Sequence, residues 1–420
     1  MNNRVIPLHL VDFRNFYLDI VLFLISPVLS LYVSFKNLTY NRRSIYIIGA
    51  FFCLFGSFLP PSQDAYRYRE MYYDTSDVTI RLFSEEGKDF LLPLLMRLFN
   101  YLGFSFENFR FVLLLFCYVL WIQIFLFFID RFYFSKKNYA LLVVCMLFCI
   151  RIYSLSYGIR FAVASIFFIY SFFLFFFVRK RFKSFTFLLL ALCMHFSIIL
   201  MILLFPVTFL LKCLRVSFKK KVLYILLLTP IISSALTDTV ELFSVMTGNE
   251  FMSGYANAYI EGTWGTNEML SWLSFNGLCY TFGRILPLLF IIAFCCCFNC
   301  NSFLANFFLS TLLLLEISLS SLSLILRFSN ISIMLGFILI LCNIKNISMQ
   351  LMKMKILSFS FVFVFILYSY AMRDDLINGK QYKAILCPIS TFLRISIQIL
   401  GCVKNCIWME YLLILQWIIN

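Results

Sequence analysis

The chain has 420 residues, of which 62% are hydrophobic and only 13% are charged, and its mean hydropathy is +0.92. Soluble domains average about 45–50% apolar and about 25% charged residues, and a soluble fold of this size cannot bury so much apolar surface. The composition therefore excludes a soluble enzyme, a disulfide-stapled secreted domain and a disordered chain. It predicts an all-α polytopic membrane protein, with residues 1–420 forming a single transmembrane helical bundle of about 12–14 spans.

The first apolar run, Phe16–Phe35, follows Arg4 and Arg14 and has no small-residue cleavage site after it. It is therefore expected to be the first membrane helix and not a cleavable signal peptide. Further long apolar runs predict later spans, because backbone polar groups in lipid must be paired within a helix. These runs are Ser44–Pro61, Phe111–Ile129, Phe161–Val178, Val222–Met246, Ile285–Leu315, Phe328–Ile344 and Ile356–Met372.

Three stretches depart from a simple span. Tyr139–Ile152 is short, about 20 Å at 1.5 Å per residue, which predicts a locally thin protein or a neighbouring water-filled cavity. Residues 184–211 separate two basic clusters that both favour the cytoplasm, so a hairpin of two short helices with its tip near Met194–Ser197 is preferred to one long helix. Residues 384–420 either span the membrane or lie in its interface.

Lysine and arginine set the expected orientation. The links at 36–43, 130–138, 179–183, 212–221, 299–302 and 344–355 hold 18 Lys and Arg in 48 residues, whereas 61–107 and 247–276 hold 5 in 77. The first set is expected in the cytoplasm. The second set is expected to form two external loops, and the loop at 61–107 is expected to contain a re-entrant or interfacial helix.

Signals for metals, nucleotides and nucleic acids are weak. Cys297 and Cys300 have C-x-x-C spacing, but a zinc site needs four ligands and the two histidines of the chain lie far from this turn. The sequence has no Walker A motif, no G-x-G-x-x-G and no D-x-D in an external loop. No cofactor or metal is therefore expected. The net charge of +15 suits anionic membrane lipid, and nothing favours nucleic acid as a partner.

Ionisable side chains at membrane depth are costly and are functional candidates by default. The candidates here share one position in the expected topology, the outer ends of the helices, where they would line a polar cavity open to the outside. They are Asp64, Arg160, His195, Arg284 and Arg327.

Two kinds of side chain suggest what such a cavity would bind. Arginine is suited to bidentate phosphate contacts, and helix N-termini also favour anions. Aromatic residues of the external loops offer flat faces for sugar rings, namely Tyr66, Tyr68, Tyr255, Tyr259 and Trp264. A lipid-linked sugar diphosphate fits both features, with its tail in membrane lipid.

Each of these residues also has an ordinary structural reading. Tyrosine and tryptophan form aromatic belts at membrane interfaces. Arg284 and Arg327 would each suit a backbone carbonyl or a lipid headgroup as partner. Asp64 would serve as a helix cap or as the partner of Arg67, and His195 as a satisfied buried histidine.

Four short motifs, in order, resemble the EpsG-like branch of the Wzy-type bacterial polysaccharide polymerases. They are Gln63-Asp64-Ala65-Tyr66, then Ile159-Arg160-Phe161-Ala162-Val163-Ala164, then His195-Phe196-Ser197, and finally Arg327. The resemblance covers roughly residues 44–343. The family often shows Ile-Arg-Gln-x-x-Ala, and this chain has Phe161 where Gln is common.

The resemblance implies an O-antigen-like polymerase of surface polysaccharide or lipopolysaccharide. Such an enzyme is a metal-independent glycosyltransferase that joins undecaprenyl-diphosphate-linked repeat units on the outer, periplasmic side of the bacterial inner membrane. It implies that Arg160 and Arg327, with Arg284 as a third, bind the diphosphate. Asp64 and His195 compete for the role of general base, and His195 has the alternative role of hydrogen-bonding the diphosphate. A chain-length regulator is the protein partner that the resemblance implies.

Other classes of protein stay open from the sequence, among them another lipid-linked glycosyltransferase and a non-enzymatic assembly protein. A lipid-linked oligosaccharide flippase or transporter is expected to show internal repeats and polar groups along a full path, and here the polar groups gather on one side. A membrane O-acyltransferase using a cytoplasmic acyl donor needs a histidine that can be reached from inside.

Overall fold

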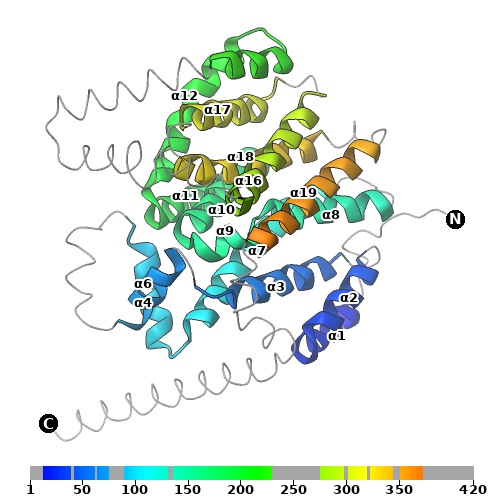
Figure 1. Cartoon of the computed structure of the whole chain (residues 1–420), viewed down its shortest axis with the longest axis vertical. Coiled ribbons are helices and arrows are strands. Elements are labelled where there is room, and N and C mark those ends of the chain that lie inside the picture. The colour runs from blue at the N-terminus through cyan, green and yellow to red at the C-terminus, as the bar shows by residue number, and fades with distance from the viewer. Residues whose placement is uncertain are drawn as a thin grey trace, which may run out of the picture.

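The computed structural model describes residues 13–38, 42–61, 64–74, 89–130, 136–228, 275–297, 301–318, 322–343 and 351–371. Every regular element in these ranges is helical (Figure 1), which confirms the all-α fold. Within these ranges, five helices are long and apolar enough to cross a membrane: Phe106–Ile129, Asn138–Tyr157, Ile159–Val178, Phe196–Cys213 and Leu324–Cys342. The chain is therefore a multi-pass membrane protein. The figure of 12–14 spans stays a prediction, since 229–274 and 372–420 lie outside the described residues.

In chain order the elements are α1 (Phe13–Ile25), α2 (Pro27–Asn37), α3 (Ser44–Ser57), α4 (Asp64–Tyr73), α6 (Leu91–Tyr101), α7 (Phe106–Ile129), α8 (Lys136–Cys149), α9 (Ile152–Tyr157), α10 (Ile159–Phe173), η2 (Leu174–Val178), α11 (Arg181–Met194), η3 (Phe196–Ile198), α12 (Ile199–Cys213), α16 (Phe275–Cys295), α17 (Phe303–Ile317), α18 (Leu322–Cys342) and α19 (Leu351–Ala371).

The expected first membrane helix is wrong as a single element. The chain breaks at Ser26, whose backbone is extended and whose hydroxyl accepts the N–H of Leu29, and Pro27 follows as the first residue of α2. Serine as the N-cap and proline at the first position are the strongest local start signals for a helix. The hydroxyl of Ser30 donates to the carbonyl of Asp19 at 3.2 Å, so α2 folds back against α1.

The central helix is α7, which is apolar on all sides and buried on most of them. Its rings pack against α18, where Phe337 stacks on Phe125 and lies 6.1 Å from Trp121. A helix that is hydrophobic all round belongs in the interior of a bundle. In Figure 1, α7 is labelled between α3 and the lower end of α19.

The short run at 139–152 is explained by a break and not by a thin protein. The α8 helix ends at Cys149, and α9 resumes at Ile152, so that Asn138–Tyr157 together reach span length. Two side chains of α7 bond carbonyls of the last turn of α8: Trp121 Nε1 donates to Met146 at 3.0 Å and Tyr118 to Leu147 at 3.4 Å. A broken helix at membrane depth is tolerated where protein groups satisfy its backbone in this way.

The expected hairpin over residues 184–211 is confirmed, with its tip at His195. The α10 and α11 helices are antiparallel neighbours, so the end of α11 returns to the start of α10, and the rings of His195 and Phe161 lie 5.3 Å apart. The α12 helix then turns back, because Phe205 packs against Phe176 at the far end of α10 and η2. The two basic clusters therefore lie toward the same end of the bundle.

Candidate functional site

The site is built around Arg160, in the first turn of α10. Gly158 separates α9 from α10, and the change of direction there places Arg160 beside α4. Its Nε donates to the hydroxyl of Tyr68 at 2.7 Å, and its guanidinium lies 5.3 Å from the centre of the Tyr68 ring. Its Nη1 pairs with Asp89 Oδ2 at 3.4 Å. Arginine has five N–H donors, so these two bonds leave three donors on Nη1 and Nη2 within the described part of the chain.

Asp89 was missed in the sequence analysis. It lies just before α6, and the side chain is only 16% exposed. Its second oxygen, Oδ1, accepts the backbone N–H of Phe196 at 2.7 Å. The residue sits in the segment SEEGKDF, where neither spacing nor neighbouring residues distinguish it from the other carboxylates of that loop. Only the folded contacts show that it reaches both Arg160 and the turn after His195.

His195 is the extended residue between α11 and η3, outside the candidate spans. Its Nδ1 accepts the backbone N–H of Ser197 at 3.3 Å and lies 3.0 Å from the Ser197 hydroxyl. An acceptor Nδ1 means that the neutral ring carries its proton on Nε2. The imidazole is thus arranged to donate a hydrogen bond through Nε2, and it does not present that nitrogen as a base.

The surroundings of His195 keep the ring neutral. Burial is the main cause that lowers the pKa of His195 to about 3, and the positive charges of Arg327 and Arg160 act in the same direction, while Asp64 opposes them. The ring of Phe161 packs edge to face against His195. It also packs edge to face against Phe328 of α18, where the ring centres lie 5.4 Å apart. Phe161 therefore forms an apolar wall beside the imidazole.

The acidic candidate Asp64 begins α4 and forms an ion pair with Arg67 at 3.1 Å, with both side chains exposed to solvent. Its charge also acts on His195. This matches the structural reading, pairing with Arg67, and places a solvent-accessible carboxylate beside the cationic cluster. Exposed ion pairs of this kind contribute about 0–1 kcal/mol, so Asp64 is available for other partners.

The two tyrosines of α4 face different ways. Tyr66 is 55% exposed, whereas Tyr68 is 3% exposed and has its ring covered by protein. Residues two apart on a helix do not share a face, whereas those three or four apart do, and Ala65, Tyr68 and Tyr72 form the buried face. Tyr66 therefore keeps a surface for a sugar ring, and Tyr68 instead holds Arg160.

A second arginine, Arg110 of α7, fixes the turn that leads into α4. It is fully buried and donates to the carbonyls of Leu59 at 2.9 Å, Gly56 at 3.0 Å and Ser156 at 3.1 Å. Gly56 lies in the last turn of α3 and Leu59 just beyond its end, where helix carbonyls favour a cation. Arg110 thereby ties the end of α3 to α9. Its position next to an apolar run gave no sign of this role.

The other site candidates from the sequence are two arginines and three aromatic residues. Arg327 lies in the second turn of α18, partly buried, and its charge reaches His195. Arg284 was expected at the outer end of its span, but α16 begins at Phe275, so Arg284 lies more than two turns inside that helix, and its side chain is not among those described. Tyr255, Tyr259 and Trp264 lie outside the described residues.

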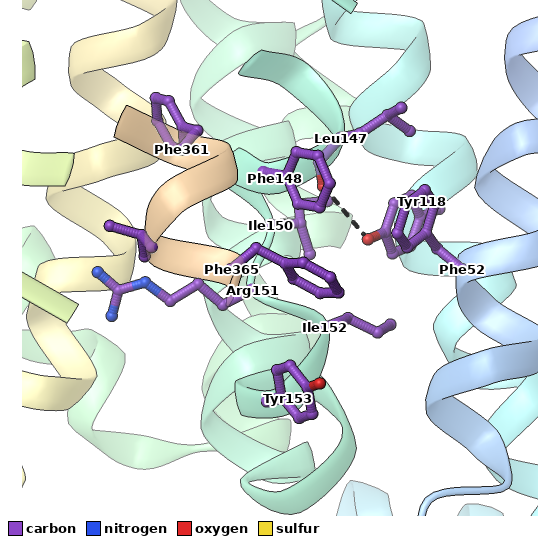
Figure 2. Close-up of a pocket in the computed structure, with 11 residues that line it drawn as sticks. Phe52, Tyr118, Leu147, Phe148, Ile150, Arg151, Ile152, Tyr153, Phe361 and Phe365 are labelled. Carbon is purple, nitrogen blue, oxygen red and sulfur yellow. Dashed lines mark hydrogen bonds between the residues drawn. The ribbon is translucent and has the colours of Figure 1, made fainter. Parts of the chain in front are cut away.

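An apolar cavity lies apart from this cluster, at the break between α8 and α9 (Figure 2). Phe52, Phe148, Phe365 and Tyr153 line it, and the hydroxyl of Tyr118 is turned to the Leu147 carbonyl. Arg151 is at its edge, and in Figure 2 its guanidinium points away from the rings; its Nη1 lies 3.5 Å from the Ser329 hydroxyl of α18. The water-filled space expected beside the short run is thus a cavity with mainly apolar walls.

The geometry joins residues from five separate elements: Tyr68 of α4, Asp89 before α6, Arg160 of α10, His195 after α11 and, through its charge, Arg327 of α18. Among the described residues, no three of His, Cys, Asp and Glu converge as metal ligands. The fold and cluster define a multi-pass, all-α membrane protein with a cationic site assembled at helix ends.

A family model described as the EpsG family matches residues 42–383. This is most of the chain, so the protein belongs to the EpsG family, a Wzy-like family of the polysaccharide-polymerase type. The resemblance seen in the short motifs is thereby confirmed, and the match includes all ten site candidates. No curated protein and no solved structure matches the chain.

Proposed function

We propose that this protein polymerises an O-antigen-like surface polysaccharide on the outer face of a bacterial inner membrane. The donor is a growing chain on undecaprenyl diphosphate, and the acceptor is one repeat unit on the same lipid. The observation that carries the proposal is Arg160, whose guanidinium is held by Tyr68 and Asp89 within the electrostatic reach of a neutral histidine. Family membership supports a polymerase in general.

The proposed reaction is glycosyl transfer. A hydroxyl of the acceptor sugar attacks the anomeric carbon of the donor, and the bond from that carbon to the diphosphate oxygen breaks. The electron pair leaves with undecaprenyl diphosphate, and the hydroxyl proton passes to a base. No cofactor enters this balance, because the glycosyl–diphosphate bond is already activated.

The residues divide the work according to their geometry. Arg160 and Arg327 bind the diphosphate and stabilise its growing charge, as preorganised cations do at a departing anion. His195 donates from Nε2 to the same group, since its Nδ1 already accepts from Ser197. The base is then Asp64, the accessible carboxylate of the cluster. Tyr66 and, from the second external loop, Tyr255, Tyr259 and Trp264 bind the glycan.

The Arg284 side chain remains a proposed third diphosphate ligand, and a chain-length regulator remains a proposed partner. Neither is needed for the chemical step as written. We also propose that the reaction is metal-independent, with positive charge from arginine at the diphosphate.

The experiment is the banding pattern of surface polysaccharide in a deletion strain carrying the wild-type gene, Arg160→Ala or no gene. The proposal predicts that deletion and Arg160→Ala both remove the ladder and leave a band with a single repeat unit. Loss of every unit would instead support a flippase. An unchanged ladder with altered mass per repeat would support an O-acyltransferase. A normal ladder in the deletion strain would contradict the proposal.

A further inference from the structure

The carboxylate of Asp89 connects two parts of the site that belong to different helices. Oδ2 pairs with Arg160 Nη1 at 3.4 Å, and Oδ1 accepts the N–H of Phe196 at 2.7 Å. Arg160 lies 71 positions away in sequence and Phe196 lies 107 positions away. One side chain therefore fixes the position of the guanidinium relative to the turn that carries His195.

The contacts of Asp89 differ from those of an ordinary surface pair. The side chain is 16% exposed and that of Arg160 is 25% exposed, whereas both partners of the Asp64–Arg67 pair are at least 36% exposed. The Phe196 N–H is one of the first donors of η3, which no carbonyl within the helix satisfies. Because the Asp89 carboxylate accepts from this N–H and pairs with the Arg160 guanidinium at the same time, it has little freedom to move away from either group.

The bonding of Arg160 shows what this arrangement leaves open. Tyr68 occupies Nε and Asp89 occupies one hydrogen of Nη1. Within the described chain, the three remaining donors lie on the two terminal nitrogens, which is the end of the guanidinium that binds phosphate in a bidentate manner. A guanidinium fixed by two partners loses less rotational freedom on binding an anion than a free side chain would.

We infer that Asp89 is a positioning residue that aligns the Arg160 guanidinium with the His195 turn for binding of a lipid-linked diphosphate. This inference rests on the proposed function for the identity of the anion. Asp89 does not contact the diphosphate itself and acts through Arg160. Its two engaged oxygens suit it to orientation, and proton transfer is left to Asp64.

The same contact would also suit an opposite role, which the sign of a measured change in affinity distinguishes from positioning. If Asp89 were a placeholder for the diphosphate, its removal would free Arg160 and tighten diphosphate binding. The bond to the Phe196 backbone favours positioning, because a placeholder must move away when substrate arrives. The sign of the change in affinity therefore separates the two roles.

The test measures binding of radiolabelled undecaprenyl diphosphate to the purified full-length protein in lipid nanodiscs. Asp89→Asn keeps an oxygen for the Phe196 N–H and removes the charge that faces Arg160. We expect about tenfold weaker binding, and a smaller loss for Asp89→Glu, which keeps the charge. The matched control is Asp74→Asn, which makes the same substitution at an exposed carboxylate after α4 and is expected to bind as wild type does.

A second background shows whether the effect passes through Arg160. In Arg160→Lys protein, Asp89→Asn should cause no further loss of affinity, whereas a residue that merely stabilises the fold would weaken both backgrounds alike. Unchanged or tighter binding by Asp89→Asn overturns the inference, and so does an equal loss in both backgrounds. If Asp89→Asn does not fold, Asp89→Glu takes its place, and an equal loss of affinity from Asp89→Glu in the wild-type and Arg160→Lys backgrounds also overturns the inference.

These outcomes are distinguishable from failure of the proposed function. Diphosphate binding by purified protein does not depend on polymerisation, so a normal polysaccharide ladder in the deletion strain would reject the polymerase and leave the Asp89 result standing. Conversely, a lost ladder combined with an unaffected Asp89→Asn protein would keep the polymerase and reject the role of Asp89.

Discussion

The hydroxyl of Tyr68 accepts a hydrogen bond from Nε of Arg160 at 2.7 Å, although the two residues lie 92 positions apart. The contact joins α4 to the start of α10. A hydrogen bond to a charged group contributes about 1.5–3 kcal/mol, and burial of Tyr68 shields this one from water. The main role of Tyr68 is therefore to hold Arg160 in place, and contact with an external ligand is secondary.

Replacing Tyr68 by Phe should lower polymerisation while leaving the protein folded. The ring and its packing remain, but Arg160 loses the acceptor on Nε, and we expect the average chain length of the polysaccharide to fall. The control is Tyr101→Phe, which removes the hydroxyl of a tyrosine on α6 that is 69% exposed. A wild-type ladder in Tyr68→Phe, with expression equal to the control, would show that this hydrogen bond does not matter for activity.

Two substitutions of His195 separate a donor from a base. His195→Gln keeps an N–H donor of similar reach and should retain part of the activity, whereas His195→Leu should retain none. A general-base role predicts that both are inactive. The readout is the rate of chain extension in membranes supplied with lipid-linked repeat units, at matched protein levels.

The pH dependence should also reflect the low pKa of His195. Because burial and the nearby arginines lower this pKa to about 3, the ring stays neutral across pH 5–8. Titration of His195 should therefore produce no step near pH 6.5 in the activity profile, so His195→Gln should not remove such a step. The native ring binds fewer protons than the unfolded one, so its contribution to stability is present above about pH 6.5 and is lost as pH falls toward 3. Thermal unfolding of wild type and His195→Gln between pH 4 and 7 measures this, and identical pH slopes would contradict it.

Arg110→Met should destabilise the protein without touching the substrate. It removes three bonds to the carbonyls of Leu59, Gly56 and Ser156 and leaves them buried, at a cost of about 3–5 kcal/mol. We expect a lower melting temperature in detergent and a parallel loss of folded protein in the membrane. Normal stability with lost activity would instead assign Arg110 to the substrate site.

The orientation of the bundle is open to a direct test with an impermeant thiol reagent. A cysteine at Asp74, exposed after α4, should react in intact spheroplasts, and a cysteine at Phe182, 84% exposed at the start of α11, should react only after permeabilisation. The exposed native residues Cys213, Cys297 and Cys342 are expected on the inner side and supply an internal control. The reverse pattern would invert the topology and place the cluster in the cytoplasm.

Much of the fold could be predicted because lipid imposes a simple rule. Long apolar runs must be helices, and clusters of Lys and Arg mark their ends, which was sufficient to predict the hairpin with its tip at His195. The breaks were less predictable. The break at Ser26–Pro27 carries a local signal, a serine N-cap followed by proline, whereas the break before Ile152 depends on side chains of α7 that satisfy carbonyls of α8.

The sequence predicted the site residues that are costly to place in apolar surroundings, and it missed a site residue that resembles its neighbours in a polar loop. Arg160 and His195 are conspicuous in apolar surroundings, and the structure brings them together. Asp89 lies among other loop carboxylates, and its role depends on partners 71 and 107 residues away. Tyr68 was expected to face a glycan, but its spacing from Ala65 and Tyr72 places it on the buried face of α4.

The central claim is that Arg160 and Arg327 bind one lipid-linked diphosphate, and affinity measures it most directly. Purified wild type, Arg160→Lys and Arg327→Lys would be titrated with undecaprenyl diphosphate in nanodiscs, alongside Arg97→Lys as a control on α6. Lysine keeps the charge but loses the fork that arginine presents to phosphate. The account predicts at least about tenfold weaker binding for Arg160→Lys and for Arg327→Lys, and unchanged binding for the control. Wild-type affinity in both variants would contradict it.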